Sequence, residues 1–134
     1  MSRTDEIFNN SYERCLEKGD LIDRFYEKYI ASNELVAQKF ARTDMKKQKE
    51  MLKASLHMIM ALRLSKPAEA VAHFKRIGVT HGRKNHDIAP ELYDLWLTCL
   101  LETVQECDAQ YDMEIDTAWR KVFSGGIKIM KSMY

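Results

Sequence analysis

The chain contains little glycine and little proline, five and two residues respectively among 134. A loop-rich β-sandwich or a collagen-like repeat needs many more of both, so the composition argues against these classes. Long hydrophobic runs are missing as well. Nothing approaches the roughly 18 consecutive apolar residues of a membrane-spanning helix, and no apolar stretch follows a basic start as in a signal peptide. We expect one cytoplasmic domain, residues 1–134, with no membrane partner.

An excess of charge of one sign is also missing. The 21 Lys and Arg residues nearly balance 20 Asp and Glu, which gives a formal net charge of +1. Such a balance provides no general attraction for a phosphate backbone, so nucleic acid is not an expected partner, although a local basic patch remains compatible with it. Hydrophobic residues make up 46% and charged residues 31%, which argues against disorder and favours a packed core.

Cysteine is scarce and irregularly spaced. The three residues, Cys15, Cys99 and Cys107, are odd in number, and none forms a C-x-x-C pair. This pattern favours reduced, buried thiols over a disulfide framework or a zinc site.

What the sequence does contain is apolar residues at helical spacing along its whole length, and no segment alternates like a half-buried strand. We therefore predict an all-α fold with about seven helices. The expected segments run from a Thr4 cap to Gly19, over about 21–31, from a Ser32 or Asn33 cap through Phe40, from Met45 to about Leu64, from Pro67 through His81, from Pro90 onward and from about Met113 onward. Gly125 and Gly126, inside the last segment, predict a kink or a close approach between helices.

Three polar residues interrupt the apolar faces of these helices: Tyr26, Gln48 and His81. Taken alone, each is more often a core residue whose polar group is satisfied by a neighbour. Together, however, they stand beside a lining rich in methionine and aromatic side chains. That lining comprises Phe40, Met45, Met51 and Leu52. The combination suits a flat apolar ligand with one coordination site.

Four histidines compete for the role of a metal ligand. His57 is expected on the solvent side of its helix, His73 lies off the apolar line, and His86 falls in a polar connection. Only His81 combines an apolar face with a helix end, and the Thr80 hydroxyl is placed to orient its imidazole. The alternative, a purely structural His81, stays open.

The order of several short sequence strings resembles that of a known protein family. The strings FYEKYI, QKEML, THG and IAPELY occur in the order and spacing typical of globins, and are most similar to those of bacterial flavohaemoglobins and single-domain bacterial haemoglobins. The resemblance covers essentially the whole chain. It implies a globin fold that encloses one haem b (iron protoporphyrin IX).

The resemblance also implies roles for the residues singled out above. Tyr26 and Gln48 correspond to the distal pair that faces bound oxygen in this family. Phe40 corresponds to the corner phenylalanine that stacks on the porphyrin, and Leu52 to the leucine that walls the distal pocket.

On the other side of the haem, the resemblance makes His81 the proximal iron ligand, with Ile77 one turn earlier beneath the ring. His86 corresponds to a position that contacts a haem propionate, a role open also to Arg83 or Lys84. Tyr93 corresponds to a tyrosine that hydrogen-bonds near the proximal histidine.

Two departures from the flavohaemoglobin pattern matter. The corner before Gln48 is shorter by two residues, and the stretch from His81 to Pro90 is longer by two, so the haem edges are expected to differ in shape. The matching final-helix glutamate and the reductase module of those proteins are missing from the 134 residues, so sustained redox turnover is expected to need a separate reductase.

The resulting expectation is a haem protein that binds oxygen reversibly and tightly, takes NO and CO as well, and is not an enzyme by itself. NO dioxygenation is expected only with an external reductase. A monomer or a weak homodimer is expected. The alternative is a non-catalytic gas or redox sensor, or a haem-free globin-like interaction module, in which His81 is a satisfied core residue.

Overall fold

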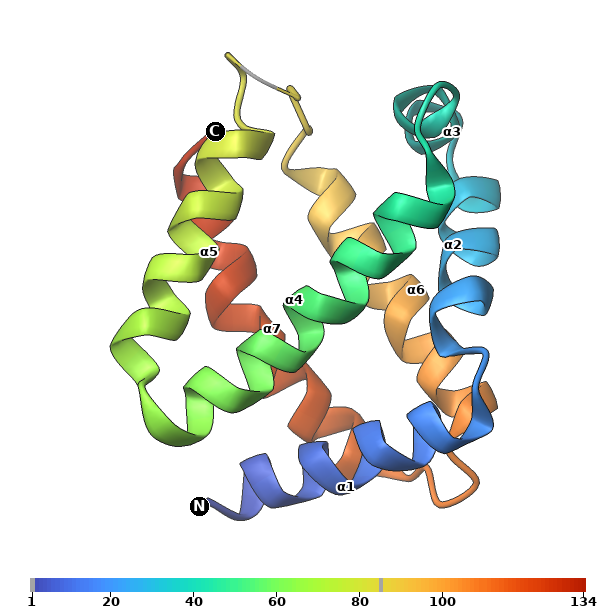
Figure 1. Cartoon of the computed structure of the whole chain (residues 1–134), viewed down its shortest axis with the longest axis vertical. Coiled ribbons are helices and arrows are strands. Elements are labelled where there is room, and N and C mark those ends of the chain that lie inside the picture. The colour runs from blue at the N-terminus through green and yellow to red at the C-terminus, as the bar shows by residue number, and fades with distance from the viewer. Residues whose placement is uncertain (1, 85) are drawn as a thin grey trace.

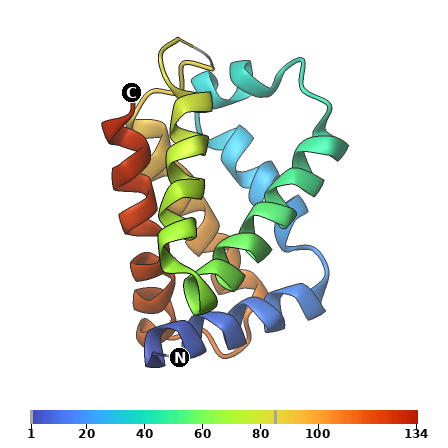
Figure 2. The same cartoon turned by 60° about the vertical axis from the view of Figure 1, so that its left-hand side comes forward.

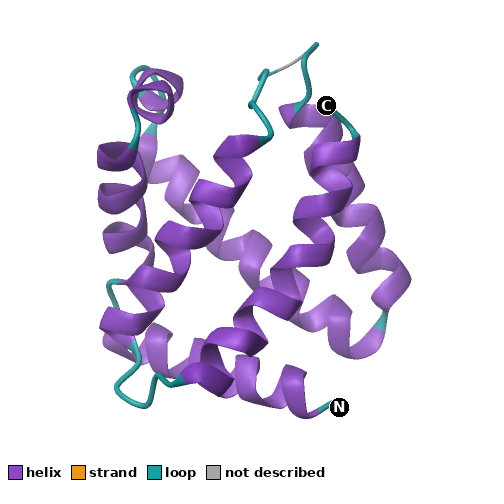
Figure 3. Cartoon of the chain, turned by 180° about the vertical axis from the view of Figure 1, so that it is seen from behind, coloured by secondary structure: helices purple, strands orange, loops and turns teal. Residues whose placement is uncertain are grey.

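The structure, a computed structural model, describes residues 2–84 and 86–134, except for the side chain of Leu64. The described part contains seven α-helices and no strand, so the predicted all-α class is confirmed (Figure 3). The helices are α1 Arg3–Lys18, α2 Leu21–Ser32, α3 Glu34–Phe40, α4 Met45–Ser65, α5 Pro67–His81, α6 Glu91–Cys107 and α7 Met113–Ser132. No helix in these residues is long and apolar enough to cross a membrane.

The helix boundaries follow short polar residues and glycine, with one correction. Ser2 rather than Thr4 caps α1, because its hydroxyl accepts a hydrogen bond from the Asp5 amide while Thr4 lies inside the first turn. Gly19 ends α1 at φ 91°, a left-handed conformation that favours glycine. Asp44 caps α4 as predicted, through the Lys47 amide.

The helices form two packed groups, which meet through α6 and α7 and are both contacted by α1 and α4. On one side α2 packs against α3 and α6, and on the other α5 packs against α7 and α4. Helix α4 begins beside α2 and crosses to α5, while α1 closes the end of the molecule opposite to α3 (Figures 1 and 2). The largest fully buried side chains include Tyr12, Phe25, Trp119 and Phe123. The first half of α4 therefore faces α2, and its second half supports α5.

The two glycines of α7, Gly125 and Gly126, have different surroundings. A Cβ on Gly126 would overlap the ring of Phe74 on α5, whereas a Cβ on Gly125 would meet nothing within 4 Å. The close helix approach predicted from the sequence is thus confirmed at Gly126, where α7 meets α5.

This difference gives a test with a built-in control. We expect Gly126→Ala to lower the free energy of unfolding by about 1–3 kcal/mol, because the methyl group must displace Phe74. Gly125→Ala should raise it by about 0.5–1 kcal/mol, since alanine is the better helix former and the space is open. Urea denaturation measures both. Equal effects of the two substitutions would contradict the contact between α5 and α7.

Candidate functional site

A first group of predicted residues comes together where α2, α3 and α4 meet; we call it the Tyr26 cluster, consisting of Tyr26, Gln48 and Phe40. The Gln48 amide, in the first turns of α4, donates a hydrogen bond to the phenol oxygen of Tyr26 at 3.1 Å. The Phe40 ring at the end of α3 meets the Tyr26 ring edge-on, with centroids 5.6 Å apart. Two polar donors and one aromatic face are therefore held together.

The phenol of Tyr26 keeps its proton. Burial raises the pKa of Tyr26, against a smaller lowering by the Gln48 hydrogen bond. Because the Gln48 amide already occupies a lone pair of the phenol oxygen, the hydroxyl hydrogen is the group left to donate. A ligand that accepts hydrogen bonds would find a donor here.

A second group of predicted residues surrounds the end of α5; we call it the His81 cluster, consisting of His81, Tyr93 and His86. The His81 and Tyr93 rings are stacked at 6.3 Å between centroids, with 24° between their planes. The exposed ring of His86 lies 5.9 Å from that of His81. Tyr93 therefore contacts His81 through its ring, and the hydrogen bond near His81 that the resemblance implies for Tyr93 stays a prediction.

One imidazole nitrogen of His81 has no partner. Its Nδ1 is buried and makes no hydrogen bond within the described residues. Burial, with a smaller contribution from nearby His86, lowers the pKa of His81 to about 4. The ring is therefore neutral near pH 7, with a lone pair on one nitrogen. A buried polar atom without a partner lowers the free energy of unfolding by about 1–3 kcal/mol. The unpaired nitrogen therefore marks His81 as a candidate functional residue.

The other two histidines have structural partners. His57 Nδ1 lies 2.9 Å from the Tyr12 hydroxyl, so His57 contacts α1. The spacing instead predicts that His57 faces solvent. That prediction is wrong because α1 covers the face of α4 that carries His57. His73 Nε2 lies 3.0 Å from the Ser55 hydroxyl and ties α5 to α4.

The Thr80 hydroxyl does not orient His81. It donates instead to the Arg76 carbonyl one turn earlier, at 3.1 Å. This is the common local bond of a helical threonine, which outcompetes a contact to the neighbouring side chain. The expected support of the imidazole by Thr80 is therefore wrong.

Tertiary contacts that the sequence did not reveal join the two clusters. The Tyr29 hydroxyl, one turn after Tyr26, donates to the Leu92 carbonyl at 3.1 Å, and Leu92 directly precedes Tyr93. The Lys39 ammonium donates to the His86 carbonyl at 3.0 Å. These contacts bring the end of α3 and the loop after α5 to the same end of the molecule, where they are seen in Figure 1.

The loop after α5 is also held from α7. The Tyr134 hydroxyl donates to the Asp87 carboxylate at 2.6 Å, and the Arg83 guanidinium lies 4.5 Å from the centre of the Tyr134 ring. Asp87 has φ 51°, a conformation uncommon for a residue with a side chain. Arg83, His86 and Asp87 are therefore held on two sides, by α3 and by the residues after α7.

Two further predicted residues, Leu52 on α4 and Ile77 on α5, are only partly buried against the core. Phe40 is partly buried as well. Partly exposed apolar side chains beside both clusters offer surface to an apolar ligand. A surface cavity of about 540 Å³ between α2 and α6 is lined by charged residues and includes none of the predicted site residues.

A bare metal ion would find few ligands. Across the residues that the structure describes, no three His, Cys, Asp or Glu side chains gather to hold a metal ion. The three cysteines are free and buried, as predicted. Among the predicted site residues, His81 offers a single imidazole, which suits a metal whose other ligands come with a macrocycle.

Comparison with known proteins gives a consistent result. The family model for globins matches residues 23–130. A crystal structure of a protein from Pseudomonas aeruginosa PAO1, described as structurally highly homologous to a human haemoglobin, is 36% identical to this chain. The alignment covers 98% of each chain, and the TM-score is 0.90. No curated protein matches the chain.

Proposed function

The chain belongs to the globin family, and from that membership we propose that it binds one haem b through His81 and takes up molecular oxygen beside Tyr26 and Gln48. Haem would supply an iron atom that the His81 imidazole could hold and that could bind a diatomic gas. The observation that carries the proposal is the buried, unpaired nitrogen of a neutral His81.

The other predicted site residues fit this proposal. Leu52, Ile77 and Phe40 keep part of their apolar surface uncovered, and a flat hydrophobic ring would cover it. Tyr93 stacks on His81 and limits the rotation of its ring. The exposed His86 ring beside His81 is suited to contact a haem carboxylate, as are the Arg83 and Lys84 side chains of the same loop.

Tyr26 and Gln48 select among gases. Oxygen accepts hydrogen bonds in such a pocket more strongly than carbon monoxide does, and the Tyr26 hydroxyl is a protonated donor positioned by Gln48. A hydrogen bond of this kind contributes about 1.5–3 kcal/mol, or roughly ten- to a hundred-fold in retention. We infer slow oxygen release, with carbon monoxide and nitric oxide as further ligands, and a role in binding rather than in catalysis by the chain alone.

A haem titration tests the proposal. The haem-free protein is titrated with haemin, and a sharp Soret band that saturates at one haem per chain is the expected result. A chain that takes up no haem would be the haem-free interaction module instead. Binding of haem without reversible uptake of oxygen would favour a redox sensor.

Replacement of the Tyr26 hydroxyl tests gas selection. We expect Tyr26→Phe to raise the oxygen dissociation rate at least about ten-fold and to change carbon monoxide release much less, because the lost hydrogen bond favours oxygen. Stopped-flow ligand exchange measures both rates. Tyr29→Phe is the matched control: it removes a hydroxyl one turn away that is bonded to the Leu92 carbonyl. Equal changes for the two gases in Tyr26→Phe would indicate altered packing instead.

A further inference from the structure

Six exposed cations gather at the end of the molecule that holds both clusters; we call them the basic rim. They lie at the end of α3, in the turn to α4, in the first turn of α4 and in the loop after α5. They are Lys39, Arg42, Lys46, Lys47, Arg83 and Lys84. Within the described residues, none of the six forms an ion pair with a carboxylate.

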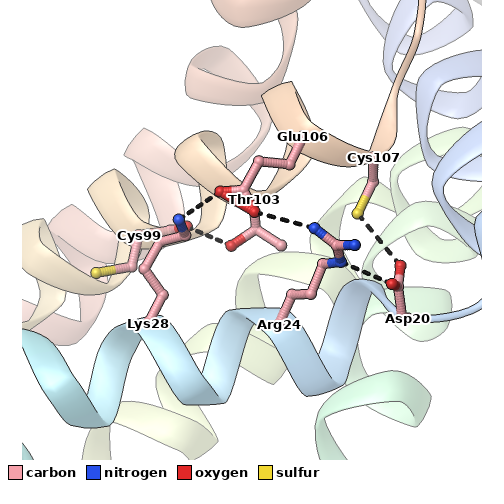
Figure 4. A network of polar contacts seen from close by, with 7 residues as sticks. All are labelled: Asp20, Arg24, Lys28, Cys99, Thr103, Glu106 and Cys107. Carbon is pink, nitrogen blue, oxygen red and sulfur yellow. Dashed lines mark hydrogen bonds and ion pairs between the residues drawn. The ribbon is translucent and has the colours of Figure 1, made fainter.

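Elsewhere the fold neutralises most of its cations. In the part of the chain that the structure describes, nine of the other fifteen Lys and Arg residues form ion pairs. Figure 4 shows the pattern on α2, where Arg24 pairs with Asp20 and Lys28 with Glu106 of α6. Two rim cations contact neutral groups, Lys39 the His86 carbonyl and Arg83 the Tyr134 ring, but within the described residues no carboxylate neutralises the charge of the six. That charge is available to meet charge from outside.

The rim borders the proposed haem site. Lys39 precedes Phe40, Lys47 precedes Gln48, and Arg83 follows His81 by two residues. The hydrogen bond from Lys39 to the His86 carbonyl joins the α3 side of the rim to the loop side. Figures 1 and 2 both place α3, the start of α4 and this loop at one end of the molecule.

Two carboxylates lie among or next to these cations, and both have partners within the chain. The Asp44 carboxylate accepts the Lys47 amide as the cap of α4, and the Asp87 carboxylate accepts the Tyr134 hydroxyl. Six positive charges thus face two negative ones, and the rim keeps a positive excess.

The charge of the rest of the molecule indicates the kind of partner. Segments 39–47 and 83–87 hold six basic and two acidic residues, which leaves 15 basic and 18 acidic residues elsewhere, a net charge of −3. A long polyanion or an anionic membrane would also meet this acidic remainder and be repelled by it. A compact acidic patch on a folded protein can contact the rim without reaching the acidic remainder.

We propose that the basic rim docks a separate acidic electron-donor protein with a reduced flavin near its acidic patch. This inference rests on the proposed function, because the rim surrounds the place where haem would meet solvent. In the docked complex the flavin loses one electron and ferric haem iron gains it to become ferrous, with no proton or group transferred. Six like charges around one site would steer the donor's acidic face toward it.

A charge-reversal experiment tests the docking surface. The probe is a bacterial flavodoxin, a small acidic flavin protein, and calorimetry measures its binding at low ionic strength. Lys46→Glu combined with Lys47→Glu should weaken binding about ten-fold or more. Acidic residues are favourable in the first turn of a helix, so this variant should fold. The matched control, Lys121→Glu with Lys128→Glu on α7, makes the same change in charge at exposed positions and should change binding less than about two-fold.

Wild-type binding should also weaken as salt is added, because exposed charges are screened. Absence of flavodoxin binding at low salt, or equal loss in both double variants, overturns the proposal. So does binding of duplex DNA or phosphatidylglycerol vesicles through Lys46 and Lys47 in place of flavodoxin. The binding readout does not need haem, and haem loading is scored separately by the Soret band. A protein that binds haem but not flavodoxin therefore refutes only the docking surface, while one that binds flavodoxin but not haem refutes only the proposed function.

Discussion

Replacement of His81 by alanine is expected to abolish the native haem spectrum, because this histidine is the imidazole we assign to the iron. Added imidazole should restore the spectrum, since a small ring can fill the space that the variant opens. His73→Ala and His86→Ala are the controls. His73 is engaged with Ser55 and His86 is exposed, so either variant should keep the native Soret band.

The stability of the haem-free protein separates this role from a structural one. His81 Nδ1 makes no hydrogen bond within the described residues, so its removal relieves a cost of about 1–3 kcal/mol while losing some ring contact with Tyr93. These effects oppose each other, and the free energy of unfolding should change by less than about 1 kcal/mol. A loss well above that value, with haem binding retained, would make His81 a core residue and the proposed iron ligand wrong.

The second large effect is expected at Asp108, whose carboxylate is fully buried between α6 and α7. It accepts hydrogen bonds from Arg14 Nε at 2.7 Å, Arg14 Nη2 at 3.0 Å and the Ser11 hydroxyl at 2.6 Å. The same Ser11 oxygen accepts the Trp119 indole at 2.9 Å. Asp108→Asn leaves Arg14 without its counter-charge and should cost about 3 kcal/mol, or about 10 °C in Tm.

An exposed ion pair provides the control for this substitution. Asp94 pairs with Lys131 at 2.7 Å, but its side chain is 66% exposed. Water screens that pair, so Asp94→Asn should cost less than about 1 kcal/mol. Thermal unfolding followed by circular dichroism measures both variants. Similar losses in the two would show that burial of Asp108 contributes little.

The effect of Asp108 should depend on pH in a defined direction. Burial by itself would raise the pKa of Asp108, but the hydrogen bonds from Arg14 and Ser11 outweigh it and hold the pKa below its usual value. A carboxyl with a lowered folded pKa stabilises the protein above its unfolded pKa of about 4, and that contribution is lost as pH falls through the folded pKa. The difference between wild type and Asp108→Asn should therefore be constant near pH 7 and shrink in acid.

The helices could be predicted because their signals are local. Spacing of apolar residues, Asp44 as a cap, Pro67 in the first turn and Gly19 at an end act within a few residues of each other. The error at the start of α1 arose because two competing local groups are close in energy. Ser2 and Thr4 are both good caps, and only the path of the chain places the Ser2 hydroxyl on the Asp5 amide.

Individual site residues could be named from the sequence because polar groups on apolar faces are unusual, but their contacts could not. Whether Gln48 reaches Tyr26, or Thr80 reaches His81, depends on side chains that approach from different helices or compete with local backbone acceptors. The resemblance to globins supplied roles for these residues.

The sequence by itself determined that this chain is all-helical, where most of its helices begin and end, and that Tyr26, Gln48 and His81 are unusual. Only the tertiary structure decided that Lys39 meets the loop after α5 and that Tyr134 holds Asp87. It also decided that Arg14 pairs with Asp108, whereas the rim cations form no ion pair within the described residues. The physical reason is the distance along the chain over which each kind of interaction acts. Helix capping and periodicity act over a few residues, whereas packing and electrostatics depend on which distant segments the folded core brings together.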